Sequence, residues 1–343
     1  MPEILVTVTG YAADGSGVAR LPDGRVAFIP GAAREDVVEI NIIKKRPRSC
    51  RAEITRILQP SPHRAEPDCP VYPACGGCDF RHITYEEELR AKLARINDAL
   101  ERIAKVSVRA DEILTTGQIN GYRNKAVFHS EERDGKAVTG FYRPKSHIVV
   151  PVDRCLLMRD KPRGAEELDG LTFQVSEGSF FQVSTGAALL LCQKAREYAA
   201  LTKEETLLDL YCGVGLFTLF LGRDAKNALG VENNPAAVAD ARENARVNGF
   251  SHVQFLCADA DEWDAGDFHP DCVVADPPRK GLSGEAVNKI LELSPKKLIY
   301  ISCDPATLAR DIKLLEGYTA RSVTAVDMFP RTAHVECCCL LTK

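Results

Sequence analysis

The feature that most constrains the fold is a regular alternation of short apolar runs and helical stretches in the second half of the chain. From about residue 182, five apolar runs are separated by stretches with helical periodicity, and these runs are LLDLY, ALGVE, VQFLC, CVVAD and LIYIS. Such an alternation is typical of a parallel sheet whose strands are joined by crossover helices. Two further runs, RSVTAVDMF and HVECCCLLTK, lie too close together for a crossover helix, so we expect an antiparallel edge pair. The sequence therefore predicts an α/β fold with a Rossmann-like domain over residues 182–343.

The first 58 residues have a different pattern, in which apolar and polar residues alternate along short runs. Gly, Asp and Pro interrupt the runs ILVTVTGY, VARLPDGRVAFIPG and VVEINIIKK. This pattern predicts an OB-like β-barrel over residues 1–58, a shape often used to bind single-stranded nucleic acid. The segment also carries a basic run, made of Lys44, Lys45, Arg46, Arg48 and Arg51. This run is either a solvated loop or a set of contacts for phosphate groups.

A middle region follows over residues 59–181 and begins with the linker-like stretch QPSP. Thr84 and Glu87 have the T-x-x-E spacing of a capping box, which predicts the start of a helix. The apolar residues that follow recur at steps of three and four, and they are Leu89, Leu93, Ile96, Leu100 and Ile103. They predict a helix over residues 85–105 that can pack on the C-terminal domain. Further along, the DG in EERDGKAV predicts a hairpin turn.

Composition limits the class of protein. The net charge of −4 does not suggest a protein held on nucleic acid by bulk charge, although a local patch can still bind it. No run approaches the roughly 18 apolar residues of a membrane helix, and MPEILVTVTG lacks the features of a signal peptide. We therefore expect a cytoplasmic protein without a membrane partner. In a reducing compartment, 13 cysteines point to free thiols or to ligands of a metal or cluster.

Polar residues at the ends of the predicted parallel strands indicate a cofactor site. In DLYCGVGLF, Gly213 and Gly215 allow a tight turn between a strand and a helix. Glu232 ends the next strand, where an acidic side chain can accept both ribose hydroxyls of an adenosine. Asp259 ends the third strand and can reach the adenine edge. Because ligands of open α/β sheets bind at the carboxyl ends of strands, this combination favours S-adenosylmethionine.

The stretch after the fourth strand bears on the target atom. It reads DPPRKG, starting at Asp276. An acidic residue followed by two prolines is typical of methyltransferases that act on exocyclic or amide nitrogens, where an aromatic residue usually follows. Here Arg279 follows instead, which disfavours an amino-group target.

A cysteine and a glutamate complete the predicted active site. Cys303 ends the fifth strand, and Glu336 lies in the last predicted strand, where it shares a face with His334. A thiolate that adds to carbon 6 of uracil turns carbon 5 into a nucleophile for a sulfonium methyl group. A base must then remove the proton from carbon 5 so that the thiolate is eliminated. Cys303 suits the first task and Glu336 the second.

Four cysteines have the spacing of ligands for a metal or cluster. Cys69, Cys75 and Cys78 lie close together, and Cys155 follows much later. Four thiolates can hold either zinc or an iron–sulfur cluster. Typical zinc sites use two close pairs, whereas the spacing here is three plus one, but thiolate ligation by itself does not separate the two.

Five stretches in the same order carry a resemblance to a known family, and they are GSFFQVS, DLYCGVG, DPPRKGL, ISCDPATLARD and MFPRTAHVE. From about residue 4 to the C terminus, the chain resembles the RNA 5-methyluridine methyltransferases, in particular their iron–sulfur branch. The resemblance implies that Cys303 is the nucleophile and Glu336 the base. It implies contacts to S-adenosylmethionine from Gln182, Tyr211, Glu232 and Asp276, and less directly from Asp259. It also implies a 4Fe-4S cluster on the four cysteines and an RNA-binding TRAM domain at the N terminus.

The resemblance implies RNA as the partner, and no protein partner is implied. We expect 23S ribosomal RNA rather than transfer RNA, because the barrel and the cluster accompany the ribosomal branch. One departure bears on the partner: only 26 residues separate Cys155 and Gln182, so most of the usual central domain is missing. Two rival interpretations remain. One is a cytosine carbon-5 methyltransferase, and the other is an RNA-binding cluster protein whose methyltransferase domain is inactive.

Overall fold

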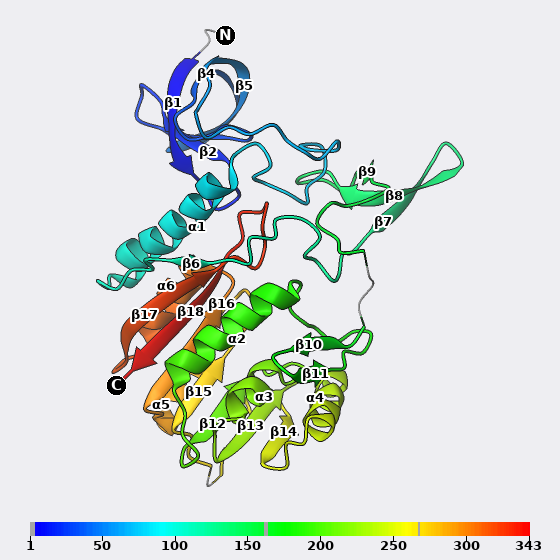
Figure 1. Ribbon diagram of the computed structural model, residues 1–343. Helices are drawn as coiled ribbons and strands as arrows, with labels where there is room; N and C mark the ends of the chain where they lie inside the picture. Colours follow the sequence, from blue (N-terminus) through cyan, green and yellow to red (C-terminus); the bar gives the residue numbers. More distant parts are fainter. Residues whose placement is uncertain (1–3, 161–163, 267) are drawn as a thin grey trace.

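The computed structural model of the protein describes residues 4–160, 164–266 and 268–343. Figure 1 shows an N-terminal barrel, a long helix beneath it, a small sheet to one side and a C-terminal α/β domain. Within the described ranges, no helix is long and apolar enough to cross a membrane.

The N-terminal barrel is confirmed. Its strands close in the order β1-β2-β3-β5-β4. They are β1 (Ile4–Tyr11), β2 (Gly17–Arg20), β3 (Val26–Ile29), β4 (Val37–Lys45) and β5 (Ser49–Gln59). The sequence patterns did not identify β5, in which only the first half alternates between buried and exposed residues. The basic run therefore spans the end of β4 and the start of β5, which pair as a hairpin.

Helix α1 (Tyr85–Ala99) connects the barrel to the C-terminal domain and continues as one π-helical segment, η1 (Leu100–Ala104). Its predicted N-cap is confirmed, since the Thr84 side chain accepts a hydrogen bond from the Glu87 backbone N–H. As expected, Ile96 and Leu100 are buried in the core of the C-terminal domain.

The apolar face predicted for α1 is wrong in part. Ile103 is 38% exposed, whereas Glu88 and Lys92 are fully buried. Lys92 pairs with Glu88 one turn away and with Asp327, which precedes the last strand. The charge of Lys92 can be buried because it is paired and hydrogen-bonded. Its partner Asp327 lies far away in the sequence, so the helical pattern alone did not indicate this burial.

A three-stranded sheet projects from the middle region (Figure 1). It consists of β7 (His129–Arg133), β8 (Lys136–Tyr142) and β9 (Val149–Pro151). Asp134 and Gly135 join β7 to β8 with positive φ at both positions, as a two-residue hairpin of the predicted kind requires.

The C-terminal domain is built on an eight-stranded sheet in the order β14-β13-β12-β15-β16-β18-β17-β6. The five predicted parallel strands are β12 (Thr206–Leu210), β13 (Asn227–Glu232), β14 (Val253–Cys257), β15 (Cys272–Ala275) and β16 (Lys297–Ser302). The last two predicted strands are β17 (Thr319–Val326) and β18 (Glu336–Thr342), which pair antiparallel.

The expected edge pair needs a correction. Strand β18 lies between β16 and β17, and the short β6 (Ile113–Leu114) of the middle region adds to β17 at the edge. The central position suits β18, since Cys337, Cys338 and Cys339 are completely buried and require cover on both faces.

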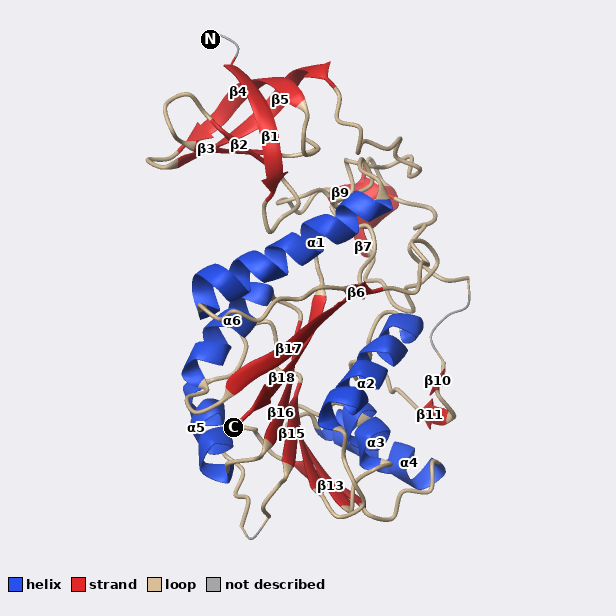
Figure 2. Ribbon diagram, turned by 60° about the vertical axis from the view of Figure 1, so that its left-hand side comes forward, coloured by secondary structure: helices blue, strands red, loops and turns tan. Residues whose placement is uncertain are grey.

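Helices cover both faces of this sheet (Figure 2). One face carries α2 (Thr185–Ala199), α3 (Leu216–Gly222) and α4 (Pro235–Val247), and the other carries α1, α5 (Gly284–Leu293) and α6 (Pro305–Leu314). The hairpin of β10 (Glu166–Leu168) and β11 (Leu171–Phe173) precedes residue 182, yet Leu168 and Phe173 pack in the same core as α2 and α3.

Candidate active site

The turn after β12 brings backbone amides to the carboxyl edge of the sheet. Tyr211, Gly213 and Gly215 all have positive φ, so the chain reverses sharply before α3 begins. A Cβ atom at Gly215 would lie 2.9 Å from Cζ of Phe255, so this close approach requires glycine. The turn is therefore built for tight packing on the neighbouring strands.

Glu232, the last residue of β13, is held against this turn. Its Oε2 accepts a hydrogen bond from the Gly213 N–H over 3.1 Å, and its Oε1 accepts one from the Asn234 N–H over 2.8 Å. Each carboxylate oxygen keeps a further lone-pair direction. The carboxylate is thus fixed in orientation and can still accept hydroxyl groups of a ribose.

Asp259 lies two residues beyond the end of β14 and is exposed. Its Oδ1 accepts a hydrogen bond from the Asp261 N–H over 2.9 Å. Burial raises the pKa of the Tyr211 hydroxyl, and the charges of Asp261 and Asp259 raise it further. All three residues follow the carboxyl ends of parallel strands, Tyr211 after β12 and the two aspartates after β14, so they belong to the same edge of the sheet.

The side chains of Gln182 and Asp276 contact each other. The Gln182 amide, which is 5% exposed, donates from Nε2 to Oδ2 of Asp276 over 3.3 Å. Asn124 of the middle region donates to the Gln182 backbone carbonyl over 2.9 Å and so fixes its position. Asp276 follows β15, and burial raises the pKa of its carboxyl to about 7. Five predicted cofactor residues and Asp259 thus come from four strand ends and the segment before α2.

Sequence patterns did not identify the side chain that supports the Gln182 segment. Asp240 of α4 accepts hydrogen bonds from the Ser176 N–H and Oγ and from the Ser179 Oγ, over 2.5–2.9 Å. Asp240 falls within an ordinary helical stretch and its partners lie more than 60 residues away, so no local signal marks it.

Cys303 and Glu336 lie at the same end of β16 and β18. In this antiparallel pair Ser302 stands opposite Cys337 as the last partners at this end; Cys303 directly follows Ser302, and Glu336 directly precedes Cys337. Glu336 is buried, and its Oε2 has no hydrogen-bond partner among the described residues. Burial and the nearby Asp276 raise the pKa of the Glu336 carboxyl to about 8. Burial and Glu336 raise the pKa of the half-buried Cys303 thiol to about 11.

His334 does not lie on the strand with Glu336, which corrects the expected shared face, because β18 begins only at Glu336. It lies in the preceding turn, where it lines a cavity of about 240 Å³ together with Cys303. Burial, Arg279 and Arg95 lower the pKa of the His334 imidazole to about 4, so it is neutral near pH 7.

Arg279 also lines this cavity, although sequence patterns noted it only as a missing aromatic. Its Nη2 lies 3.4 Å from Nε2 of His334. Its positive charge opposes the upward shifts in the pKa of Cys303 and of Glu336. The cavity thus combines a thiol, a guanidinium group and a neutral imidazole beside a buried carboxyl, which is suited to nucleophilic addition followed by proton removal.

The four spaced cysteines lie together. Cys69, Cys75, Cys78 and Cys155 all line one cavity of about 260 Å³ in the middle region. Two of their sulfur atoms accept hydrogen bonds, from the Gly77 N–H over 3.4 Å and from Nε of Arg81 over 3.3 Å. Burial raises the pKa of the Cys78 thiol to about 11, and Arg81 counteracts the shift.

Within the described part of the chain, no group of three or more His, Cys, Asp or Glu side chains is arranged to hold a metal ion. The four cysteines nevertheless line one cavity whose walls are mostly apolar and include Phe141, Val152 and Leu157. Four cysteines and N–H groups directed at sulfur are the residue types that hold an iron–sulfur cluster, so the chemistry of the donor set suits such a group.

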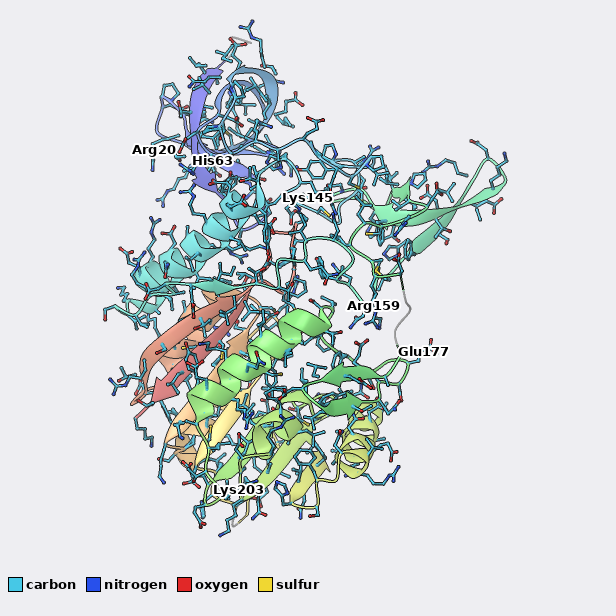
Figure 3. The ribbon with its side chains drawn as sticks, in the orientation of Figure 1. Arg20, His63, Lys145, Arg159, Glu177 and Lys203 are labelled. Atoms are coloured by element: carbon cyan, nitrogen blue, oxygen red, sulfur yellow. The ribbon has the colours of Figure 1, made fainter. Side chains whose placement is uncertain are left out.

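A basic groove of about 650 Å³ runs along the barrel. Its positive side chains are Lys44, Arg46, Arg51 and Lys145. Lys145 lies between the barrel and the three-stranded sheet (Figure 3), where its Nζ pairs with Asp14 over 3.0 Å. Ala13 and Asp14 line both this groove and the Cys303 cavity. The groove therefore adjoins the candidate active site and is complementary to a polyanion.

Comparison with known protein families gives two matches. A model of the tRNA (Uracil-5-)-methyltransferase family matches residues 166–343, and a model of the TRAM domain matches residues 2–55. A protein of Halalkalibacterium halodurans named as an uncharacterized RNA methyltransferase is 31% identical, with 96% of this chain and 95% of the relative covered. A protein of Gloeobacter violaceus with the same description is also 31% identical, with 99% and 96% covered. The first alignment runs over 435 positions, so part of that relative has no counterpart in the 343 residues of this chain.

A solved structure has the same fold from end to end. It is the Pyrococcus abyssi tRNA (uracil-54, C5)-methyltransferase in complex with S-adenosyl-L-homocysteine. The TM-score is 0.72, and the match covers 99% of both chains at 22% sequence identity. The predicted combination of an N-terminal barrel and a Rossmann-like methyltransferase domain is therefore confirmed.

Proposed function

Because the chain belongs to the tRNA (uracil-5-)-methyltransferase family, we propose that it methylates carbon 5 of a uridine in structured RNA through a covalent bond from Cys303 to carbon 6. The observation that carries this proposal is that Cys303 and Glu336 adjoin the last partners of β16 and β18 beside the cofactor edge, where the charge of Glu336 acts on the Cys303 thiol. A nucleophile and a base at that position match the two tasks that this chemistry requires.

Cys303 begins the reaction. Its Sγ bonds to carbon 6 of the uracil, the carbon 5–carbon 6 π electrons move toward the carbon-4 oxygen, and the thiol proton passes to solvent. Burial and Glu336 raise the pKa of the Cys303 thiol to about 11 although Arg279 opposes the shift, so little thiolate exists at pH 7. The positive charge of Arg279 favours the thiolate form, and the proton leaves as the bond to carbon 6 forms.

Glu336 completes the reaction. When bound, S-adenosylmethionine would supply the methyl group to carbon 5 and leave as S-adenosylhomocysteine. Glu336 then takes the proton from carbon 5, the carbon 5–carbon 6 double bond forms again, and Sγ leaves as thiolate. A carboxyl whose pKa is about 8 holds the proton more firmly than an ordinary glutamate, so it is a stronger base once ionised.

The residues at the strand ends form the proposed cofactor site. Glu232 is assigned to the ribose hydroxyls, while Asp259 and the Tyr211 ring flank the adenine. Gln182 and Asp276 are assigned to the methionine part, where a carboxylate offsets the positive sulfonium. The amide of Gly213 keeps Glu232 in place.

We propose 23S ribosomal RNA as the substrate, on the resemblance of the barrel and of the cysteine set. The basic groove would hold the strand beside the target uridine, which must leave its stack to reach Cys303. Transfer RNA is the alternative, and one observation favours it: the Pyrococcus abyssi enzyme, whose fold matches end to end, is described as acting on transfer RNA.

For the four cysteines we propose a 4Fe-4S cluster that ties the middle region together. The cysteine segment lies against the candidate active site, since Asp79 and Phe80 donate backbone hydrogen bonds to the Arg331 carbonyl over 2.9 and 3.1 Å. Methyl transfer needs no electron, so the proposed role of the cluster is structural.

The test uses unmodified ribosomal RNA and transfer RNA, each incubated with the protein and tritiated S-adenosylmethionine. Label recovered as 5-methyluridine from ribosomal RNA supports the whole proposal, and label only from transfer RNA replaces the substrate. Label in 5-methylcytidine would overturn the uridine assignment. RNA binding without any label would support the rival interpretation of an inactive, cluster-bearing RNA-binding protein.

A further inference from the structure

Helix α1 presents charged side chains to the segment that leads into Glu336. Glu88, Lys92 and Arg95 follow one another at steps of four and three, so they lie on one face of the helix. All three contact residues 327–335, the connection between β17 and β18. This face of α1 is therefore not simply a solvated helix surface.

The first two contacts anchor the beginning of the connection. Lys92 donates from Nζ to Oδ1 of Asp327 over 2.6 Å and to the Phe329 carbonyl over 3.1 Å. Glu88 accepts a hydrogen bond from the Arg331 N–H over 2.7 Å. These groups are buried, so the first half of the connection is fixed independently of Arg95.

The third contact joins the two halves of the active site. Arg95 donates from Nη1 to the Ala333 carbonyl over 3.0 Å and from Nη2 to Oδ2 of Asp304 over 2.8 Å. Ala333 directly precedes His334, while Asp304 directly follows Cys303. One guanidinium group therefore bridges the segment of the nucleophile and the segment that leads to the base.

Asp304 is a rigid anchor for this bridge. It is the N-cap of α6, and its Oδ1 accepts hydrogen bonds from the Ala306 and Thr307 N–H groups over 2.9 and 3.0 Å. Its other oxygen is directed at Arg95. The planar guanidinium group holds both acceptors in a fixed geometry, which the single ammonium group of lysine does not reproduce.

We propose that Arg95 is a positioning residue that holds the wall carrying Cys303 at a set distance from the wall carrying His334. Arg95, Cys303, Asp304 and His334 all line the same cavity of about 240 Å³. The width of this cavity decides how a pyrimidine ring meets the thiol. The consequence for catalysis rests on the proposed function, whereas the structural bridge itself does not.

The experiment compares Arg95→Met and Arg95→Lys with a matched control in η1, the helical segment that continues α1. Arg102→Met is the control, because the Arg102 side chain is 76% exposed and only pairs with Asp98 at 3.7 Å. For each protein we measure the thermal midpoint, amide hydrogen exchange over residues 328–335 without RNA, and kcat and KM with each substrate.

Arg95→Met should speed exchange at Ala333 and His334 and lower kcat by about 10- to 100-fold, because small displacements of reacting groups are costly. The KM for S-adenosylmethionine should stay within twofold and Arg95→Lys should recover part of kcat, while Arg102→Met should match the wild type. The Ala333 and His334 N–H groups donate to Asp79 Oδ2 and Thr332 Oγ1, so unchanged exchange in Arg95→Met would mean that these two bonds hold the segment without Arg95, which overturns the bridge. Faster exchange with unchanged kcat overturns the positioning role. If the wild type itself transfers no methyl group, the proposed function fails, and the exchange data still decide whether the bridge exists.

Discussion

Cys303 and Glu336 adjoin the last partners of β16 and β18, Ser302 and Cys337, although 32 residues separate Cys303 from Glu336 in the chain. The nucleophile and the base of the proposed reaction therefore lie at the same end of these two strands. Burial and the charge of Glu336 raise the pKa of the Cys303 thiol, while burial and the charge of Asp276 raise the pKa of the Glu336 carboxyl. The following predictions depend on this relationship and on the surfaces that surround it.

Replacing the nucleophile should stop the reaction before any bond forms. Cys303→Ala should lower methyl transfer by about a thousandfold or more and abolish covalent capture of RNA that contains 5-fluorouridine. Capture is read as a protein–RNA band that survives denaturation. Binding of S-adenosylhomocysteine, measured by calorimetry, should stay close to wild type and serves as the control. A captured band with this variant would assign the nucleophile to another residue.

Replacing the base should instead stop the reaction after methyl transfer. Glu336→Gln should bind both substrates and form the covalent bond, but it should release product slowly because the carbon-5 proton stays in place. The denaturation-resistant band should therefore accumulate on ordinary RNA, with labelled methyl in it. Turnover at the wild-type rate would show that Glu336 is not the base.

The buried carboxyl should also make stability depend on pH. The pKa of Glu336 is raised from 4.5 to about 8, so the folded protein holds a proton that the unfolded chain releases between these values. This contribution to stability is full below pH 4.5 and is lost as pH rises through about 8. Glutamine does not ionise, so the Glu336→Gln variant does not lose this stability as pH rises. The thermal midpoint of the variant should therefore exceed that of the wild type more at pH 8 than at pH 5. An equal difference at both pH values would contradict the raised pKa.

The basic groove should contribute to RNA binding through charge. The triple variant with Lys44, Arg46 and Arg51 changed to Gln should weaken binding and reduce the slope of log K against log salt, by roughly 0.7 per lost phosphate contact on a single strand. Lys203→Gln is the control, since Lys203 lies at the far end of the molecule from the barrel (Figure 3). Filter binding at several salt concentrations measures both the affinity for RNA and the slope of log K against log salt. An unchanged slope in the triple variant would place the RNA elsewhere.

The cysteine cavity should hold iron and sulfide. Protein purified without oxygen should be brown and contain about four of each per chain, whereas Cys75→Ser should lose both and unfold at a lower temperature. Cys257→Ser is the control, because Cys257 is exposed and lies outside the cavity. Zinc in a colourless wild-type protein would contradict the cluster.

Local features of the fold were predictable because they depend on neighbouring residues. Thr84 caps α1 with its own hydroxyl, and Asp134-Gly135 supplies the positive φ values of a hairpin turn. Glu232 and Asp276 could be assigned to one site from the sequence, since the carboxyl ends of parallel strands meet at the same edge of a sheet. The regular spacing of the apolar runs was sufficient to predict the parallel strands and therefore to assign both residues to one edge.

Other features depended on partners that are distant in the chain. The pattern of α1 placed Ile103 on the apolar face of the helix, yet Ile103 is 38% exposed, and Lys92 is buried because Asp327 neutralises it. Strand β18 was expected in an edge pair, and its place beside β16 brings together the strand ends that Cys303 and Glu336 adjoin.

The sequence by itself determined which elements form and which chemical groups the chain carries to the ends of its strands. Only the tertiary structure decided which of those groups meet, and it added Arg95 as the bridge between them. The physical reason is that periodicity and turn residues act over a few positions. The pairing of buried charges and the order of strands minimise the free energy of the whole molecule.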